Sequence, residues 1–328
     1  DLDESLIPSI RVGPRVKILF NNRPRVGYVI GLKDQTAFPK ISPIISILDK
    51  DVSLSEQTLK LTNEMSQYYG CSWGEAIETV LPRYLCHGEI FSSSTRVAVN
   101  NERKDCFGKN VLFNYNIKEE RCWEYLQERV RGVLANKQSV IVLVPESQLV
   151  ERVKIRWQKF FNDSIFFHEQ PVTPKQEFIY WQSIHQTSVS LVVGTRSSVF
   201  SPVNNLGLIV IFDEQHMSFK QEQSPSYHVN EIAMMRERIE GCRLLFISYA
   251  PSINIRYQAN VNGWEQLQDA VSVKSELQII DMNNYNPRKT SMLSIPLQNS
   301  IREVLESQGR VLIFMNRGSF FEFIYYYL

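Results

Sequence analysis

The fold is decided by residues 189–216, which read VSLVVGTRSSVFSPVNNLGLIVIFDEQH. This stretch contains two apolar runs rich in branched residues, Leu191–Val193 and Leu208–Phe212, and polar residues follow each run. Short, continuous apolar runs of this kind are typical of parallel strands that are buried on both faces. Ligands of parallel sheets bind at the carboxyl ends of the strands, here at residues 194–197 and 213–216. The stretch therefore predicts an α/β domain with a ligand site at this edge of the sheet.

The acidic motif Asp213–His216 (DEQH) carries the strongest functional signal. Phosphoryl transfer needs a metal ligand beside a group that positions water, and two adjacent carboxylates can supply both. An Asp at a strand end is also a common helix cap, so the neighbouring residues must distinguish a functional motif from a capped strand end. Gly194–Ser197 precedes the motif, and Ser218–Glu222 and Pro225–His228 follow it. Together these segments resemble the first lobe of superfamily 2 helicases of the primosomal replication-restart (PriA) family.

The resemblance implies a role for each residue of this edge. Asp213 would hold magnesium if a nucleotide binds, Glu214 would orient the attacking water, and His216 would couple the nucleotide to nucleic acid. The segments on either side of the motif would contact single-stranded DNA, by polar contacts to phosphates and by stacking of bases on aromatic rings. The residues expected to do so are Thr195, Arg196, Ser197, Phe219, Lys220, Tyr227 and His228.

The N-terminal region predicts a small β-rich domain. Turn signals separate three short strands, Val16–Phe20, Val26–Gly31 and Ile44–Leu48. A helix follows, with a capping box at Ser53–Glu56, an apolar face at Leu61, Met65 and Tyr68, and an end at Gly70.

This region resembles the 3′-end DNA-binding domain of the same family, which holds the 3′ end of the leading strand at a stalled fork. The resemblance implies that Arg23 and Arg25 contact phosphates. Gly27 would allow the backbone to approach a nucleotide closely, because glycine has no side chain.

The phosphate-binding loop of such an ATPase is degenerate here. A glycine-rich loop ending in Gly-Lys-Ser/Thr should follow the first core strand, Val111–Phe113, and precede a helix at 121–134. Residues 114–122 read NYNIKEERC instead, which places Arg121 at the lysine position and Cys122 at the magnesium-binding hydroxyl position. No glycine remains to turn the backbone amides inward, and Glu119 and Glu120 would repel phosphates. The family implies ATP and Mg²⁺, but this loop predicts that hydrolysis is lost.

Three further positions depart from the family pattern. Ser226 and Asn230 stand where arginines are usual, and Ala250 stands where the family has a threonine in the motif that links hydrolysis to movement. We therefore interpret the chain as a divergent, ATPase-deficient member of that family, or a fragment of one.

Four segments are expected in the chain. A 3′-end DNA-binding domain would span residues 1–86, a linker 87–110, a RecA-like parallel α/β helicase lobe 111–272, and the start of a second lobe 273–328. In this last segment we expect a helix at 297–307 and a strand at 310–315.

Composition sets limits on these interpretations. The 328 residues are 43% hydrophobic and 22% charged, with a net charge of +1, so the overall charge does not indicate a nucleic-acid binder. The sequence has no long apolar run and no signal pattern at its start, which favours a cytoplasmic protein. The cysteines have no metal-ligand spacing, so we expect no zinc site; they are Cys71, Cys86, Cys106, Cys122 and Cys242.

Three functions remain open from the sequence. The preferred one is binding of forked or single-stranded DNA at a 3′ end in replication restart, with single-strand-binding protein and other primosome proteins as partners. The second is an active ATP-dependent 3′-to-5′ DNA helicase, favoured by the intact Asp213–His216 motif. The third is a non-catalytic protein-interaction scaffold, which fits the near-neutral charge.

Overall fold

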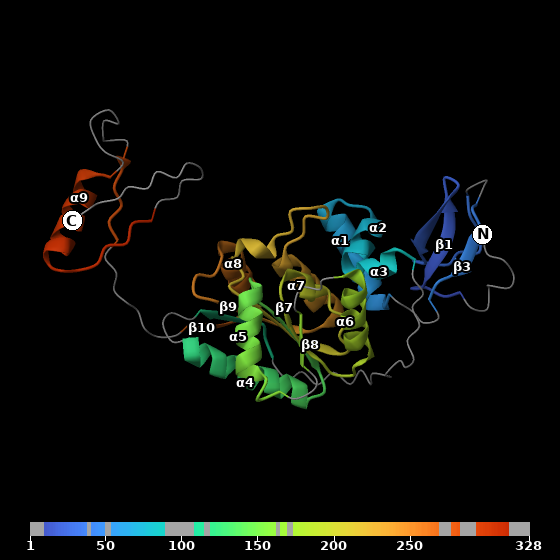
Figure 1. Ribbon diagram of the computed structural model, residues 1–328, viewed down its shortest axis with the longest axis horizontal. Helices are drawn as coiled ribbons and strands as arrows, with labels where there is room; N and C mark the ends of the chain where they lie inside the picture. The colour runs from blue at the N-terminus through green and yellow to red at the C-terminus, as the bar shows by residue number, and fades with distance from the viewer. Residues whose placement is uncertain are drawn as a thin grey trace. The chain divides into compact units, whose positions relative to one another are not determined.

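The computed structural model describes residues 10–37, 41–49, 54–88, 108–114, 119–161, 165–168, 173–268, 277–282 and 293–314 (Figure 1). Two of the sequence predictions therefore lie wholly or mostly outside the described residues: the centre of the phosphate loop, 115–118, and the linker, of which 89–107 are not described. The chain divides into two compact units, Asp1–Val271 and Ser272–Leu328.

The first unit begins with a small antiparallel sheet. Its strands are β1 (Arg15–Phe20), β2 (Arg23–Tyr28) and β3 (Ile44–Ile47), in the order β2-β1-β3. All three strands predicted from the sequence are formed. Asn21 and Asn22 join β1 to β2 with φ angles of 52° and 57°, the left-handed geometry of a tight two-residue hairpin.

A buried ion pair joins this sheet to the helices that follow. The side chains of Arg15 and Asp49 are both 0% exposed, and Arg15 Nη2 lies 2.5 Å from Asp49 Oδ1. The backbone amide of Arg15 donates to Asp49 Oδ2 at 2.7 Å, and Arg15 Nη1 donates to the carbonyl of Leu85 in helix α3 (Arg83–Cys86). Removing one member of such a pair leaves an uncompensated buried charge, which costs about 3–5 kcal/mol.

Helices α1 (Glu56–Tyr69) and α2 (Trp73–Val80) follow the sheet. Gly70 ends α1 with φ 66°, as predicted. The predicted capping box at Ser53–Glu56 is wrong, because the N-cap is Ser55, whose hydroxyl accepts from the amide of Thr58 at 3.1 Å.

The predicted apolar face of α1 is also partly wrong. Leu61 and Met65 are buried as expected, but Tyr68 is 60% exposed. Tyr69 packs against the core in its place.

A seven-stranded sheet forms the body of the first unit, and every pair of neighbouring strands in it is parallel. This arrangement confirms the predicted parallel α/β fold. In spatial order its strands are β10 (Glu265–Gln268), β4 (Val111–Asn114), β9 (Arg243–Ser248), β8 (Leu206–Phe212), β5 (Ser139–Leu143), β7 (Leu191–Gly194) and β6 (Ile165–Phe167).

Helices cover both faces of this sheet (Figure 1), because successive side chains of a strand point to opposite faces. On one face Val140 and Val142 belong to a core shared with α4 (Glu119–Ala135) and α5 (Ser147–Trp157). On the other face Ile141 and Leu143 belong to a core shared with α6 (Pro174–Gln186), α7 (Val229–Glu240) and α8 (Ile253–Val261).

The N-terminal helices pack directly on the parallel-sheet body. Leu61 and Met65 of α1 belong to the same core as Ile232 of α7. Trp181 of α6, 8% exposed, lies in a third apolar cluster with Leu85 and other residues of the N-terminal region. The N-terminal region and the parallel sheet therefore share buried cores within one unit.

The described part of the second unit contains helix α9 (Ile295–Glu306), close to the predicted 297–307, and no residue of this helix is buried. The strand predicted at 310–315 is not formed by residues 310–314, which are exposed. The apolar pattern there has no paired neighbour within the described residues of the chain, so the prediction is corrected at these positions.

Candidate nucleic-acid interface and nucleotide site

The acidic motif lies at the carboxyl end of β8, as the sequence predicts. The amide of Asp213 donates to the carbonyl of Ile247 in β9 at 2.7 Å, and the amide of His216 donates to the carbonyl of Asp213 at 2.8 Å. Asp213 has φ 47°, in the left-handed region that an Asp can adopt in a tight turn. The turn leaves Asp213 partly exposed and sends Glu214 into the interior.

Glu214 is completely buried, and protein donors occupy both of its carboxylate oxygens. Oε1 accepts from the amide of Ser252 at 2.6 Å. Oε2 accepts from the Ser252 hydroxyl at 2.9 Å and from Nδ2 of Asn230 at 3.0 Å. Ser252 is the N-cap of α8, and Asn230 lies in the first turn of α7. Glu214 therefore ties two helices to the end of β8.

The residues at the degenerate phosphate-loop positions lie in the first turn of α4. Cys122 is 1% exposed and belongs to the apolar core beneath the helix, whereas Arg121 is exposed. Glu120 forms an ion pair with Arg156 of α5, and the Arg156 guanidinium lies over the ring of Trp123, 5.3 Å from its centre.

Two features of these residues are unfavourable for binding ATP with magnesium. A magnesium ligand at position 122 would need an oxygen that faces the phosphates, and the residue there is a thiol buried among apolar side chains. A water-positioning carboxylate would have to face the phosphates, and Glu214 is 0% exposed and accepts three hydrogen bonds from Ser252 and Asn230.

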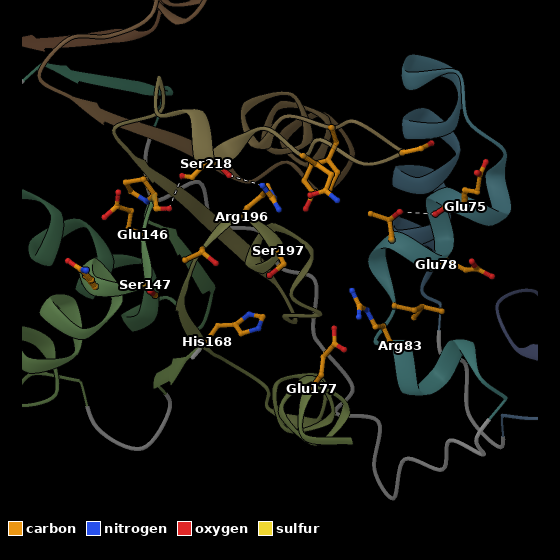
Figure 2. A pocket seen from close by; sticks show the side chains of 18 residues that line it. Glu75, Glu78, Arg83, Glu146, Ser147, His168, Glu177, Arg196, Ser197 and Ser218 are labelled. Atoms are coloured by element: carbon orange, nitrogen blue, oxygen red, sulfur yellow. Dashed lines mark hydrogen bonds between the residues drawn. The ribbon is translucent and has the colours of Figure 1, made fainter. Parts of the chain in front are cut away.

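A polar cleft of about 760 Å³ lies at the other half of the same sheet edge (Figure 2). It is bounded by the ends of β5, β6 and β7 on one side and by α2 and α3 on the other. The cleft brings together Thr195, Arg196 and Ser197 with Ser218 and Tyr227. Its lining includes four carboxylates and two guanidinium groups, so its excess of negative charge disfavours a phosphate backbone; these groups belong to Glu75, Glu78, Glu146, Glu177, Arg83 and Arg196.

Two of the predicted base-stacking residues are core residues. Phe219 is 0% exposed and Tyr227 is 4% exposed, and both belong to the core on the α7 side of the sheet. The ring of Tyr227 packs edge-on against Phe200 at 5.0 Å. The expectation that these rings stack on bases is corrected, because protein atoms already cover them.

Arg196 organises the loop after the acidic motif. Its Nη1 donates to the carbonyls of Ser218 and Lys220 at 3.0 and 2.8 Å, contacts that Figure 2 shows in part. Lys220 is exposed, and its Nζ donates to the carbonyl of Ser226 at 2.7 Å. Arg196 therefore holds this loop in place, and it also lines the cleft beside Thr195 and Ser197.

The histidines at this edge lie next to the same loop. Nε2 of His216 lies 3.6 Å from Glu146 Oε1, and Nδ1 of His216 accepts from the amide of Ser218 at 3.2 Å. His228 caps α7 through its ring, and burial together with the positive charge of Lys220 lowers its pKa.

The small N-terminal sheet presents a separate cationic face. In the register of β1 and β2, Arg23 lies opposite Phe20 and Arg25 lies opposite Ile18. Residues directly opposite each other share a face of the sheet, so both arginines lie beside Phe20, which is 62% exposed. Phe20 was not expected from the sequence at this surface, although an aromatic residue beside the Asn21-Asn22 turn could have indicated it.

Gly27 lies on the same face, opposite Val16. A Cβ at Gly27 would lie 3.2 Å from Ile18 Cδ1 and 3.4 Å from Val16 Cγ2. Packing within the sheet is therefore sufficient to explain a glycine here.

Comparisons with known proteins found two family models that match parts of the chain. The family model described as "3′DNA-binding domain (3′BD)" of PriA matches residues 2–82, and the model described as "DEAD/DEAH box helicase" matches residues 108–254. The structure of the Pyrococcus furiosus Hef helicase domain covers 51% of this chain and 37% of its own, with 16% identity and a TM-score of 0.39.

The two family-model matches cover a 3′ DNA-binding domain and, after it, a DEAD/DEAH box helicase region. Among curated proteins, the chain is similar to replication restart protein PriA. It is 30% identical to the Bacillus subtilis protein over 61% of this chain and 25% of that protein. It is 26% identical to the Rickettsia prowazekii protein over 95% of this chain and 50% of that protein. The chain thus spans between a quarter and a half of the length of these relatives.

Proposed function

We propose that the chain binds forked or single-stranded DNA with a free 3′ end, as a PriA-type replication-restart protein, and that it does not hydrolyse ATP. The match to a 3′ DNA-binding domain over residues 2–82 and the exposed arginines of the hairpin support the DNA-binding part. Restart of stalled replication is proposed from the names of the relatives.

The observation that carries the non-catalytic part is the engagement of Glu214. The residue that would orient water for hydrolysis is 0% exposed and already accepts three hydrogen bonds from Ser252 and Asn230. Asp213, Glu214 and His216 therefore keep the position of the motif at the end of β8 but do not catalyse hydrolysis. The buried thiol of Cys122 supports the same conclusion, because no hydroxyl stands at that position.

On the DNA side, Arg23 and Arg25 contact phosphates, and Gly27 lies beneath the bound nucleotide. A second set of contacts comes from Thr195 and Ser197, which line the cleft, and from Lys220 and His228 in the loop after the acidic motif. The acidic lining makes these contacts weaker than those of the hairpin, since every phosphate placed there meets carboxylates as well as arginines.

The test is fluorescence anisotropy with a labelled fork that carries a free 3′ end and with the same fork lacking that end. The wild type should prefer the free end, and Arg25→Ala should weaken its binding. Lys17→Ala is the matched control, because Lys17 is an exposed cation on the opposite face of the same sheet, opposite Val26. Equal losses for the two variants would contradict a specific hairpin interface.

The second candidate is an active ATP-dependent 3′-to-5′ DNA helicase. It is favoured by Asp213, which remains partly exposed at the carboxyl edge in a turn fixed to β9. DNA-stimulated phosphate release that Asp213→Ala abolishes would establish this candidate. Under the preferred function, Asp213→Ala binds the fork within about threefold of the wild type, because no catalytic step depends on it.

The third candidate is a protein-interaction scaffold, favoured by the polar cleft of about 760 Å³. Single-strand-binding protein and other primosome proteins are its proposed partners, in the cytoplasm. Binding of these proteins by a chain that binds no fork would favour this candidate over the first.

Within the described residues, no helix is long and apolar enough to cross a membrane.

A further inference from the structure

One hydrogen bond joins the N-terminal helices to the loop after the acidic motif. The backbone amide of His228 donates to the hydroxyl of Tyr69, the last residue of α1, at 3.1 Å. Burial raises the pKa of Tyr69 to about 12, so the phenol stays protonated at neutral pH. His228 is also paired with Lys220 in an antiparallel bridge that closes the base of the loop. The Tyr69 hydroxyl therefore fixes the end of this loop.

From His228 the hydrogen bonds continue to the acidic motif. The ring Nδ1 of His228 accepts from the amide of Asn230 at 3.2 Å, which caps α7. The side-chain Nδ2 of Asn230 donates to Glu214 Oε2 at 3.0 Å and to the carbonyl of Glu214 at 3.3 Å. Asn230 is 7% exposed, so water does not compete strongly for these contacts. Three residues thus connect the end of α1 to the motif.

Helix α7 is attached to α1 along its length as well as at its start. Arg238 of α7 forms an ion pair with Glu64 of α1. Met65 of α1, 0% exposed, belongs to the same core as Ile232 and Met235 of α7. Closely packed helices of this kind move together, because well-packed interiors are not easily deformed. A displacement of α1 would therefore be passed to α7 and to Glu214.

We propose that Tyr69 is a positioning residue that ties the N-terminal DNA-binding region to the acidic motif through α7, so that DNA bound by the N-terminal region alters the stability of the loop at 217–228. The DNA-dependent half of this inference rests on the proposed function. The structural half, that Tyr69 holds the His228 amide, does not.

Hydrogen–deuterium exchange, with fragmentation that resolves the His228 amide, tests both halves. Tyr69→Phe removes the hydroxyl and keeps the ring. Tyr257→Phe is the control, because Tyr257 of α8 is a tyrosine that is 63% exposed. Without DNA, exchange at His228 should be about fivefold faster in Tyr69→Phe, the loss expected for one hydrogen bond, and within twofold of the wild type in Tyr257→Phe.

With the fork bound, His228 exchange should change at least twofold in the wild type and in Tyr257→Phe. It should not change in Tyr69→Phe, whose Kd for the fork should stay within about threefold of the wild-type value.

An unaltered His228 exchange rate in Tyr69→Phe without DNA, or a response to DNA that persists in this variant, would overturn the inference. So would loss of fork binding by a folded Tyr69→Phe, because Tyr69 would then be a DNA contact. A wild type that does not bind the fork would overturn the proposed function, whereas a wild type that binds without any change at His228 would overturn this inference alone.

Discussion

Replacing Glu214 tests whether its carboxylate stabilises the fold. In Glu214→Ala the amide and hydroxyl of Ser252 and the side-chain amide of Asn230 lose their acceptors in a site that is 0% exposed. Each unsatisfied buried donor costs about 1–3 kcal/mol, and the Ser252 hydroxyl can rotate to relieve part of the cost. We therefore expect a total destabilisation of about 3 kcal/mol. For a unit of this size, that loss lowers Tm by roughly 6–12 °C.

Thermal unfolding followed by circular dichroism measures this effect. Glu222→Ala is the control, because Glu222 is an exposed carboxylate in the neighbouring loop, and its loss should change the free energy of unfolding by less than about 0.5 kcal/mol. Glu214→Gln should fall between the two, because its amide keeps one acceptor oxygen and turns an NH₂ group toward existing donors. A Glu214→Ala protein as stable as the wild type would refute the reasoning that this carboxylate is a structural tie.

Three further predictions concern other parts of the first unit. Asp49→Asn should destabilise the protein by about 3–5 kcal/mol, because the buried Arg15 loses its counter-charge, and a loss below about 1 kcal/mol in urea unfolding would contradict this. Arg25→Ala should flatten the salt dependence of fork binding by about 0.7 in log–log slope, one phosphate's worth on a single strand; an unchanged slope would exclude the contact. Burial lowers the pKa of His168 below its ordinary 6.5, so the unfolded state binds more protons and the free energy of unfolding should fall as pH drops below about 6.5. His168→Gln should make the pH dependence of Tm shallower, and an identical dependence would count against the buried neutral imidazole.

Much of the fold follows from local pattern. The apolar runs at 191–193 and 208–212 can satisfy their backbone and bury their side chains only as central parallel strands, which is how β7 and β8 are found. Gly70 takes the left-handed conformation that ends α1, as glycine at such a position indicates. The placement of the acidic motif at the end of β8 follows from the same reasoning.

The sequence predictions that were wrong concern residues whose environment depends on contacts distant in sequence. Phe219 and Tyr227 are aromatic residues near a ligand-binding edge, and periodicity does not distinguish a base-stacking ring from a core ring. Their burial depends on packing that includes Phe200, and the loop is held by Arg196, more than twenty residues upstream. In the same way, Glu214 is engaged by residues of two later helices, and no local pattern predicts those contacts.

The central claim is that this chain binds a DNA fork without using ATP. Calorimetric titration of ATP with Mg²⁺ into the full chain, in the presence and absence of the fork, tests it most directly. We predict no saturable heat up to about 1 mM nucleotide, which corresponds to binding weaker than about −4 kcal/mol, while the fork itself still titrates. Stoichiometric micromolar ATP binding that Arg121→Ala abolishes would contradict the account.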